Sequence, residues 1–276
     1  YQSILFQIPA VDVIYNELYK YSQPKNTNQV QKNNFELRNI NISVKFQNIE
    51  YTYPKSNRVS LKDISFEVNS GDSIGIIGKS GAGKSTLTDI LLGLLEPHVG
   101  SIKFIDSNSG NEIKDYKSIL GYVPQTIYLT DDTLKNNIAF GEEEEFIDTA
   151  AINNILGLCQ LTDFVKTLPN GIDTFVGDRG LRLSGGQKHR IGIARALYKN
   201  PSILVLDEAT SAVDNLTEID IMNSLKKLNN QITLIIISHR LSTVLDCDKI
   251  IELENGKVIN IVKKSEVGNF IANKEK

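Results

Sequence analysis

At 276 residues, the chain has room for one large α/β domain with something smaller beside it, and its 41% hydrophobic content is enough for a core. A formal net charge of −3 gives no basic surface, which argues against nucleic acid as a partner. Two cysteines, Cys159 and Cys247, fit neither a metal site nor a disulfide framework and indicate a reducing compartment. No stretch approaches the roughly 18 apolar residues that cross a bilayer, so we expect the chain as given to be soluble.

The first 34 residues divide into an apolar part and a polar part. Apolar side chains of residues 1–20 recur at spacings of three and four, which predicts a helix whose single apolar face needs a partner. Because the chain starts at Tyr1 without methionine, we interpret this helix as the end of a truncated segment, although a processed terminus would look the same. Residues 21–34 (YSQPKNTNQVQKNN) are predicted to be a linker, which leaves 35–276 as the folded domain.

Residues 42–68 alternate apolar and polar side chains, as strands do, and residues 100–105 and 118–124 read as two further short strands. Tyr53 lies in a loop of the first region, where its ring could stack on a purine. The alternative is a partly buried tyrosine with a structural role. Gln125 directly follows the strand predicted at 118–124.

The glycine-rich run GKSGAGKST lies between a predicted strand at 73–77 (SIGII) and a predicted helix from about 83 to 95. Glycines let backbone N–H groups turn inward, and the helix start adds the positive end of its dipole. Lys84 should reach the β- and γ-phosphates of a nucleotide, and the Ser85 hydroxyl should ligate Mg²⁺. A glycine-rich turn without a ligand is the alternative, which the flanking elements disfavour. We therefore expect nucleotide binding by Gly78, Lys79, Ser80, Gly81, Ala82, Gly83, Lys84, Ser85 and Thr86.

Between Gln125 and Leu183 the pattern becomes helical, with helices predicted at 146–160 and 161–167, and the acidic run at 142–145 reads as a solvated loop. The run LSGGQ then opens another helix, with Ser184 as its N-cap. We interpret this helix start as a second anion-binding end with bare backbone donors. Two such ends in one chain suggest one nucleotide held between two copies, head to tail. The residues concerned are Ser184, Gly185, Gly186 and Gln187.

Two continuous apolar runs, at 202–206 (SILVL) and 231–238 (QITLIIIS), predict parallel strands covered on both faces. The first delivers Asp207 and Glu208, and the second His239, to the carboxyl edge where ligands of such sheets bind. An Asp there can hold Mg²⁺ and the adjacent Glu can polarise an attacking water. A carboxylate pair that caps the next helix, and a histidine with a structural role, are the alternatives. The run ENGK at 254–257 predicts a hairpin turn.

Taken together, these motifs resemble the nucleotide-binding domain of an ATP-binding cassette (ABC) transporter of the exporter type, over about residues 42–262. The resemblance implies a P-loop NTPase core of α/β class, an antiparallel β flank and an inserted α-helical subdomain at about 126–183. It also implies ATP and Mg²⁺ as ligands. By this likeness, Tyr53 stacks on adenine, and Gln125 and Asp207 ligate Mg²⁺. Glu208 and His239 act in catalysis together with Gln125, Asp214 belongs to the loop that follows Glu208, and residues 184–187 clamp the ATP of the partner copy.

The resemblance also extends to the ends of the domain. By this likeness, residues 1–20 are the end of a fused transmembrane domain and residues 21–34 its connector, so the full-length protein would hold this domain at the cytoplasmic side of the plasma or inner membrane. Two positions depart from the family: Asp178 stands where exporters usually have Glu, and Val213 where they usually have Leu. A weak likeness of residues 9–18 to exporters of lipid-linked sugars does not name a cargo.

We therefore expect an ATPase that forms a homodimer around two ATP molecules and drives a membrane domain by closing and reopening. The alternatives are the ATPase subunit of an importer, a soluble ABC ATPase of DNA repair or translation, and a nucleotide-sensing module without catalysis. Residues 1–34 disfavour the importer, the absence of a coiled-coil insertion or a second cassette disfavours the soluble ATPases, and Glu208 disfavours the sensor.

Overall fold

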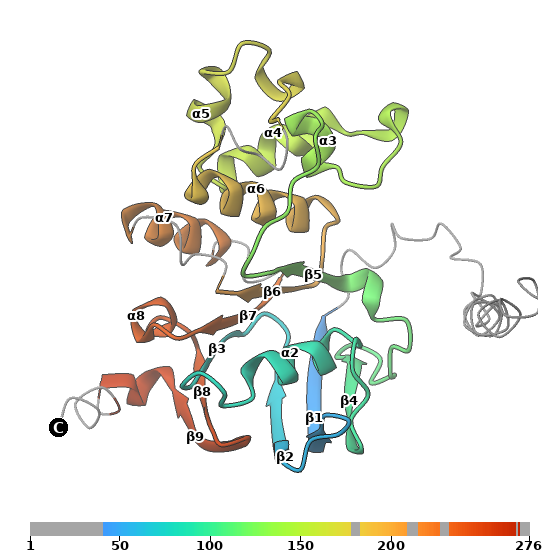
Figure 1. Ribbon diagram of the computed structural model, residues 1–276, viewed down its shortest axis with the longest axis vertical. Helices are drawn as coiled ribbons and strands as arrows, with labels where there is room; N and C mark the ends of the chain where they lie inside the picture. The colour runs from blue at the N-terminus through green and yellow to red at the C-terminus, as the bar shows by residue number, and fades with distance from the viewer. Residues whose placement is uncertain (1–40, 178–182, 209–214, 227–231, 269, 271–276) are drawn as a thin grey trace, which may run out of the picture. The chain divides into compact units, whose positions relative to one another are not determined.

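The computed structural model describes residues 41–177, 183–208, 215–226, 232–268 and 270, all within the structural unit Leu37–Lys276 (Figure 1). The predictions for residues 1–20 and 21–34 lie outside the described residues, as do those for Asp178, Val213 and Asp214. None of the described helices is both long enough and apolar enough to cross a membrane.

A six-stranded sheet forms the centre of the domain, in the order β5-β6-β7-β3-β8-β9. All neighbouring strands are parallel except β8 and β9, which form the predicted antiparallel hairpin. β6 and β7 are buried nearly throughout, which confirms the prediction of strands covered on both faces, and β3 is buried in the same way. The strands are β3 (Ser73–Ile77), β5 (Leu120–Val123), β6 (Ile203–Asp207), β7 (Thr233–Ser238), β8 (Lys249–Glu254) and β9 (Lys257–Lys263).

The predicted antiparallel flank is a second sheet of three strands, in the order β2-β1-β4. It comprises β1 (Ile42–Thr52), β2 (Val59–Val68) and β4 (Val99–Asp106). Buried positions alternate with exposed ones along β2, since only one face of this strand meets the core. The strands predicted within 42–68 and at 100–105 are thus confirmed and are longer than the patterns indicated.

Successive side chains of the central sheet point into two separate cores. Ile74, Ile76 and Val205 share a core with helix α2 (Lys84–Leu91) and the antiparallel flank. Leu204 and Ile236 point the other way, into a core that includes side chains of helices α6 (Gly185–Tyr198), α7 (Asn215–Lys226) and α8 (Leu241–Val244). The central sheet is therefore the middle layer of three, and β3 connects directly to α2 at its carboxyl end.

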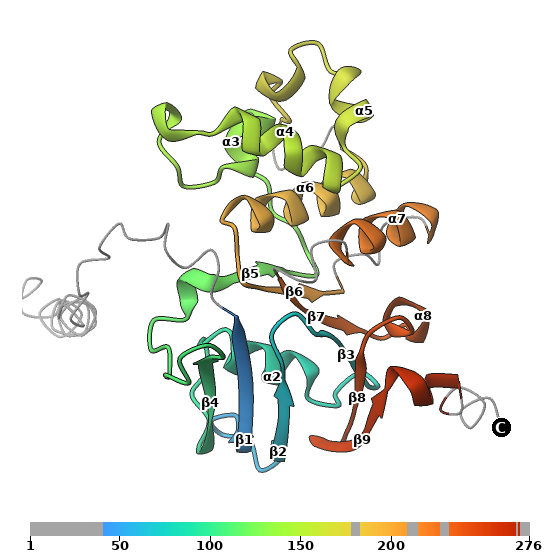
Figure 2. The same cartoon turned by 180° about the vertical axis from the view of Figure 1, so that it is seen from behind.

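The region between β5 and α6 is helical, as expected for residues 126–183. It contains α3 (Leu134–Ile138), α4 (Thr149–Leu158), α5 (Thr162–Lys166) and short 3₁₀ turns. In Figures 1 and 2 these helices group together with α6 beyond the β5 edge of the sheet. The helices predicted at 146–160 and 161–167 are present but shorter, and α3 was not predicted.

Helix α2 is shorter than its sequence pattern indicated. The apolar spacing predicted a helix to Leu95, but the helix ends at Leu91, and Gly93 adopts a left-handed conformation with φ 67°. Leu94, which the apolar spacing places on the same face as Leu87 and Leu91, is 68% exposed. The pattern failed here because the chain changes direction while its leucines continue at helical spacing.

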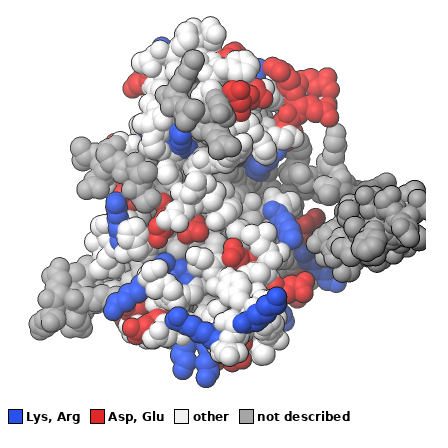
Figure 3. Space-filling model, in the orientation of Figure 1, with Lys and Arg blue, Asp and Glu red and all other residues white. Residues whose placement is uncertain are grey.

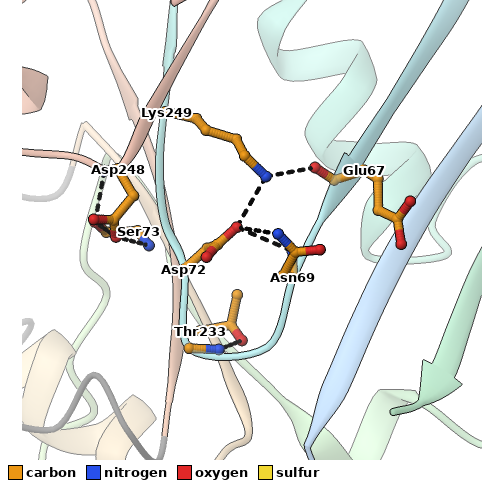
Figure 4. Close-up of polar contacts among 8 residues, drawn as sticks. Glu67, Asn69, Asp72, Ser73, Thr233, Asp248 and Lys249 are labelled. Carbon is orange, nitrogen blue, oxygen red and sulfur yellow. Dashed lines mark hydrogen bonds and ion pairs between the residues drawn. The ribbon is translucent and has the colours of Figure 1, made fainter. Parts of the chain in front are cut away.

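Polar side chains join the strands at the amino edge of the central sheet, opposite the end where β3 meets α2 (Figure 4). Asp248 accepts hydrogen bonds from the backbone N–H of Ser73 at 2.9 Å and from its hydroxyl at 2.6 Å. Asp72 forms an ion pair of 3.0 Å with Lys249, and Thr233 accepts from the N–H of Gly71 at 2.9 Å. These contacts fix β3 between β7 and β8 and so set the position of the opposite edge.

On the face drawn in Figure 3, Lys and Arg side chains are interspersed with Asp and Glu. The acidic run at 142–145 is exposed, as predicted for a solvated loop. Within it, Glu142 pairs with Lys199 at 2.6 Å and Glu144 pairs with Lys135 at 2.8 Å.

Candidate functional site

A cavity of about 740 Å³ opens at the carboxyl edge of β3, β6 and β7. Its lining combines the glycine-rich loop with the polar residues that follow the neighbouring strands. The predicted site residues that line it are Tyr53, Ser80, Gly81, Gly83, Lys84, Ser85, Thr86, Gln125, Asp207, Glu208 and His239. The fold therefore brings into one cavity predicted site residues that lie up to 186 positions apart in sequence, since Tyr53 and His239 both line it.

The glycine-rich loop presents an uncapped helix start to this cavity. Helix α2 begins after Gly83, whose φ of 106° strongly favours glycine, and a Cβ there would lie 2.9 Å from the carbonyl oxygen of Ser60. No side chain caps the helix and its first turn holds no acidic residue. Its first N–H groups and the positive end of its dipole are thus available to an anion such as phosphate.

The Lys84 ammonium lies over the loop that precedes it. It donates to the carbonyl oxygens of Gly78 at 2.7 Å and Lys79 at 3.2 Å. An ammonium has three donors, so the third can bind a phosphate oxygen while the loop stays closed. Gly78, Lys79 and Ser80 also line a smaller cavity of about 240 Å³ beside the first, and Ala82 is buried within the loop.

Asp207, at the end of β6, is half-buried and accepts a hydrogen bond of 3.3 Å from the hydroxyl of Tyr122. Burial raises the pKa of the Asp207 carboxyl, and the negative charges of Glu208 and Asp89 raise it further. The Tyr122 hydrogen bond and the Lys84 charge act in the opposite direction on this pKa. A carboxylate whose charged form is disfavoured by burial and by neighbouring carboxylates is suited to a cation.

Glu208 is held by both of its carboxylate oxygens. The side-chain amide of Gln125 donates to Oε2 at 2.7 Å, and Nδ1 of His239 lies 3.1 Å from Oε1. Its backbone has a φ of 48°, a left-handed conformation uncommon outside glycine, and its N–H donates to the carbonyl of Ile237 on β7. Such backbone conformations concentrate at functional sites. Three predicted catalytic residues therefore lie in contact at the cavity, with Glu208 between Gln125 and His239.

Tyr53 also lines the cavity and is 40% exposed. Its ring packs edge-on against Tyr51, with centroids 5.1 Å apart, and its hydroxyl lies 3.3 Å from the Thr86 hydroxyl. Tyr51 in turn stacks on His98. The ring of Tyr53 is thus braced from one side while part of it remains open to a planar ligand.

Five residues that line the cavity were not predicted: Arg58, Val59, Ser60, Asn255 and Gly256. The last two form the turn of the β8–β9 hairpin, and the N–H of Gly256 donates to the carbonyl of Ala82 at 3.0 Å. The Asn-Gly signal in the sequence predicts the turn but not its location. Only the pairing of β8 with β3 carries this turn to the phosphate loop.

The start of α6 does not line the cavity, so the structure does not bring residues 184–187 to the other predicted residues in one copy of the chain. Ser184 caps the helix as predicted, but the helix start is not bare. The Ser184 hydroxyl accepts from the Gln187 N–H at 3.2 Å, and the Gln187 side chain accepts from the Ser184 N–H at 2.8 Å. Ser184 and Gly185 are exposed. Asp214 lies outside the described residues.

Comparisons with known proteins agree with this geometry. The family model described as ABC transporter matches residues 61–211, more than half of the chain. The chain is 38% identical over 275 residues to the ATP-dependent permease MDL1 of Candida albicans, covering 98% of this chain and 39% of that protein. It is 36% identical over 229 residues to an ATP-dependent lipid A-core flippase of Photobacterium profundum, covering 81% of this chain and 38% of the flippase.

A solved structure of a bacterial Atm1-family ABC exporter with ATP bound superposes on 86% of this chain with a TM-score of 0.76 and 37% sequence identity. This chain covers 42% of that exporter, and it spans about 40% of the length of the relatives named above. The matched region includes the phosphate loop, the start of α6 and the two carboxylates after β6. The chain therefore belongs to the ABC transporter family, as a nucleotide-binding and ATP-hydrolysing domain of the exporter type.

Proposed function

We propose that this chain binds ATP with Mg²⁺ in the cavity at the carboxyl edge and, as a head-to-tail pair of copies, uses hydrolysis to power export by a membrane domain. The observation that carries this proposal is the Glu208 carboxylate, fixed on both oxygens at the cavity that the phosphate loop lines. A carboxylate so held is suited to orient an attacking water and to accept its proton. Hydrolysis then requires the terminal phosphate to lie between Lys84 and this water.

Mg²⁺ is a hard cation that prefers oxygen ligands and is usually bound through one or two protein groups together with substrate phosphates. The Ser85 hydroxyl, the Gln125 amide oxygen and the Asp207 carboxylate line the same cavity and supply such oxygens. These residues fit the ion, and they would hold it beside the phosphates. When bound, the ion would neutralise charge that develops on the phosphate oxygens.

The separation of the two helix starts supports a dimer. In one copy, the start of α2 lines the cavity and the start of α6 does not, while Ser184 and Gly185 are exposed. A second copy placed head to tail would bring its α6 start to the open side of the cavity. Residues 184–187 would then contact the terminal phosphate of the ATP bound by the other copy.

The names of the relatives support export over import. They are called a permease, a flippase and an exporter, and each is more than twice as long as the part that this chain matches. We infer that this chain works with a transmembrane domain of the same longer protein, at the cytoplasmic face of the membrane. The predicted apolar helix of residues 1–20 is the segment that would continue into that domain.

The substitution Glu208→Gln tests the proposed function. It keeps the shape of the side chain and removes the base, so hydrolysis of ATP should fall by about 100-fold or more while ATP still binds. Phosphate release would measure turnover, and titration calorimetry would measure binding. The matched control Glu67→Gln removes a carboxylate from an exposed ion pair with Lys45 and should leave turnover unchanged. Turnover of Glu208→Gln at the wild-type rate would contradict the role of Glu208.

Lys84→Ala tests the phosphate cradle separately, because it removes the ammonium that donates to the carbonyl oxygens of the loop. Loss of a charge-assisted hydrogen bond to phosphate should weaken ATP binding by about tenfold or more. Calorimetry with ATP in the absence of Mg²⁺ isolates this contact from the metal. An unchanged dissociation constant would rule out the assigned binding mode.

A further inference from the structure

His189, on the second turn of α6, is a buried polar residue that the proposed chemistry does not use. The residue is only 9% exposed. Nδ1 lies 2.9 Å from the carbonyl oxygen of Gly185, and Nε2 lies 3.0 Å from the carbonyl oxygen of Gln125. The ring thus joins two segments that are 64 residues apart in sequence.

The two contacts of the ring differ in what they contribute. Gly185 is four residues before His189, so its carbonyl already belongs to the hydrogen-bond ladder of α6. Gln125 lies outside the described helices and strands, and no described backbone N–H donates to its carbonyl oxygen. A carbonyl only accepts, so Nε2 bonds to Gln125 in ring forms with a proton on Nε2, just as Nδ1 bonds to Gly185 in ring forms with a proton on Nδ1. Every form of the ring with a proton on Nε2 makes this bond, whichever way Nδ1 is protonated.

Gln125 also forms the contact that orients Glu208, since its side-chain amide donates to Oε2 at 2.7 Å. One residue therefore receives a hydrogen bond from α6 on its backbone and passes one to Glu208 from its side chain. A shift of α6 along its axis would move the Gln125 backbone through His189 and change the 2.7 Å contact. His189 itself does not line the cavity.

We propose that His189 is a positioning residue that couples the start of α6 to Glu208 through Gln125. The inference rests on the proposed function, in which the α6 start contacts ATP held by another copy and Glu208 orients water in its own copy. Contact at one nucleotide would then reach the hydrolytic carboxylate of the other site through two residues, His189 and Gln125.

Two substitutions separate the hydrogen bond from the volume of the ring. His189→Phe keeps a ring of similar size and removes the donor, and we expect it to lower kcat about tenfold. His189→Gln keeps an N–H at a similar reach, and we expect its kcat to stay within about threefold of wild type. The dissociation constant of ATP without Mg²⁺ should not change in either, because the ring does not line the cavity. Equal kcat for wild type and His189→Phe would overturn the proposal.

A double-mutant cycle with Gln125→Ala tests whether His189 acts through Gln125. If it does, His189→Phe lowers kcat by less than about twofold once the Gln125 side chain is absent, because the relay to Glu208 is already broken. Multiplicative effects of the two substitutions on kcat would instead show that His189 acts by another route, which overturns the proposal. This cycle is informative even if both single variants are slow.

Thermal unfolding serves as the folding control for each variant, because an unpaired Gln125 carbonyl could lower stability. If His189→Phe does not fold, His189→Met, which adapts its shape more readily, takes its place in the same cycle. Failure of the proposed function would look different. In that case the wild-type protein would not hydrolyse ATP, or Glu208→Gln would hydrolyse it at the wild-type rate. If only this inference fails, the wild-type protein still hydrolyses ATP and Glu208→Gln is still slow, but His189→Phe has no effect on kcat.

Discussion

Asp207 and Glu208 are neighbours in sequence but have different surroundings. Glu208 accepts a hydrogen bond from the Gln125 amide and has His239 Nδ1 3.1 Å from its other oxygen, whereas Asp207 is half-buried with one hydrogen bond, from Tyr122. Burial raises the pKa of Asp207, and two nearby carboxylates raise it further. The fold therefore holds this carboxylate at a cost to stability that a bound cation would relieve.

The substitution Asp207→Asn should stabilise the folded chain at neutral pH in the absence of nucleotide and Mg²⁺. The pKa of Asp207 is higher in the folded state than in the unfolded state, so the folded state binds the proton more tightly. Stability is then lost as pH rises from the ordinary carboxyl range through the raised pKa, and the loss persists above it. Asn has no proton to lose. Thermal unfolding of both proteins from pH 4 to 8 should show a difference that grows with pH.

Asp106 supplies the control of opposite sign. Hydrogen bonds from Ser109 and Asn108 hold the pKa of this exposed carboxyl below its usual value. The carboxylate therefore stabilises the folded state at neutral pH, and this stabilisation is lost on acidification through the lowered pKa. Asp106→Asn should therefore lower the unfolding temperature slightly at pH 7, and the difference should shrink in acid. If Asp207→Asn also destabilises the chain at pH 7, the account of Asp207 as a destabilising carboxylate is wrong.

At the scale of elements, the position of His239 depends on how α8 packs on the sheet. Helix α8 begins two residues after His239, and its Val244 lies directly over Gly75 of β3. A Cβ at Gly75 would lie 2.5 Å from the Val244 Cβ, too close for any side chain. The missing side chain is therefore what lets α8 approach the sheet next to the cavity.

Gly75→Ala should consequently push α8 away and destabilise the chain by about 1–3 kcal/mol, as overpacked cores do. Urea unfolding measures this, and lowered turnover would report the displaced His239. Gly157→Ala in α4 is the matched control, because the nearest atom to its Cβ would be the Thr162 hydroxyl oxygen at 4.0 Å. In this exposed helical position alanine should raise the free energy of unfolding by about 0.5–1 kcal/mol. Equal unfolding midpoints for the two variants would contradict the packing argument.

The elements that the sequence predicted best are those whose pattern is decided by burial alone. β3, β6 and β7 are covered on both faces, so continuous apolar runs identify them without knowledge of their neighbours. Helix α3 has five residues, too few for a periodic signal, and only its N-cap Thr133 marks it locally. The end of α2 was misplaced because Gly93 interrupts a leucine pattern that continues beyond it.

The same distinction holds for the site. Asp207, Glu208 and His239 follow predicted strands, and parallel strands deliver their carboxyl ends to one edge, so their proximity could be predicted. Tyr122, Asn255 and His189 reach the site or its contacts only through the strand order and through the packing of α6 near Gln125. A linear pattern does not contain these pairings, so no motif in the sequence indicated them.

At the scale of the whole molecule, the two helix starts that we propose to contact ATP differ in structure. The start of α2 is uncapped and lines the cavity, while the start of α6 is capped by Ser184 and Gln187 and is exposed outside it. If each ATP needs both, a single copy cannot complete a site. Hydrolysis should then depend on residues from two copies, which mixing experiments can detect.

Mixing Lys84→Ala with Ser184→Asp should restore hydrolysis that neither variant shows alone. Aspartate caps a helix as well as serine does, so Ser184→Asp keeps α6 folded while its charge repels the phosphate held by the other copy. In a mixed dimer, the unaltered Lys84 of one copy meets the unaltered Ser184 of the other. Random pairing makes half of the dimers mixed, each with one intact site of two, so about one quarter of wild-type turnover should return.

A mixture of Lys84→Ala with Glu208→Gln is the control for this restoration. Both substitutions alter the same half of the site, so in a mixed dimer each site carries one of the two and none is intact. Phosphate release from this mixture should remain near background. Ser184→Asn, which caps without a charge, should retain most turnover as a single variant, because repulsion rather than loss of the cap is what disables Ser184→Asp. If Ser184→Asp alone hydrolyses ATP at the wild-type rate, or if its mixture with Lys84→Ala recovers no more turnover than the control mixture while Ser184→Asn is active, the head-to-tail arrangement is wrong.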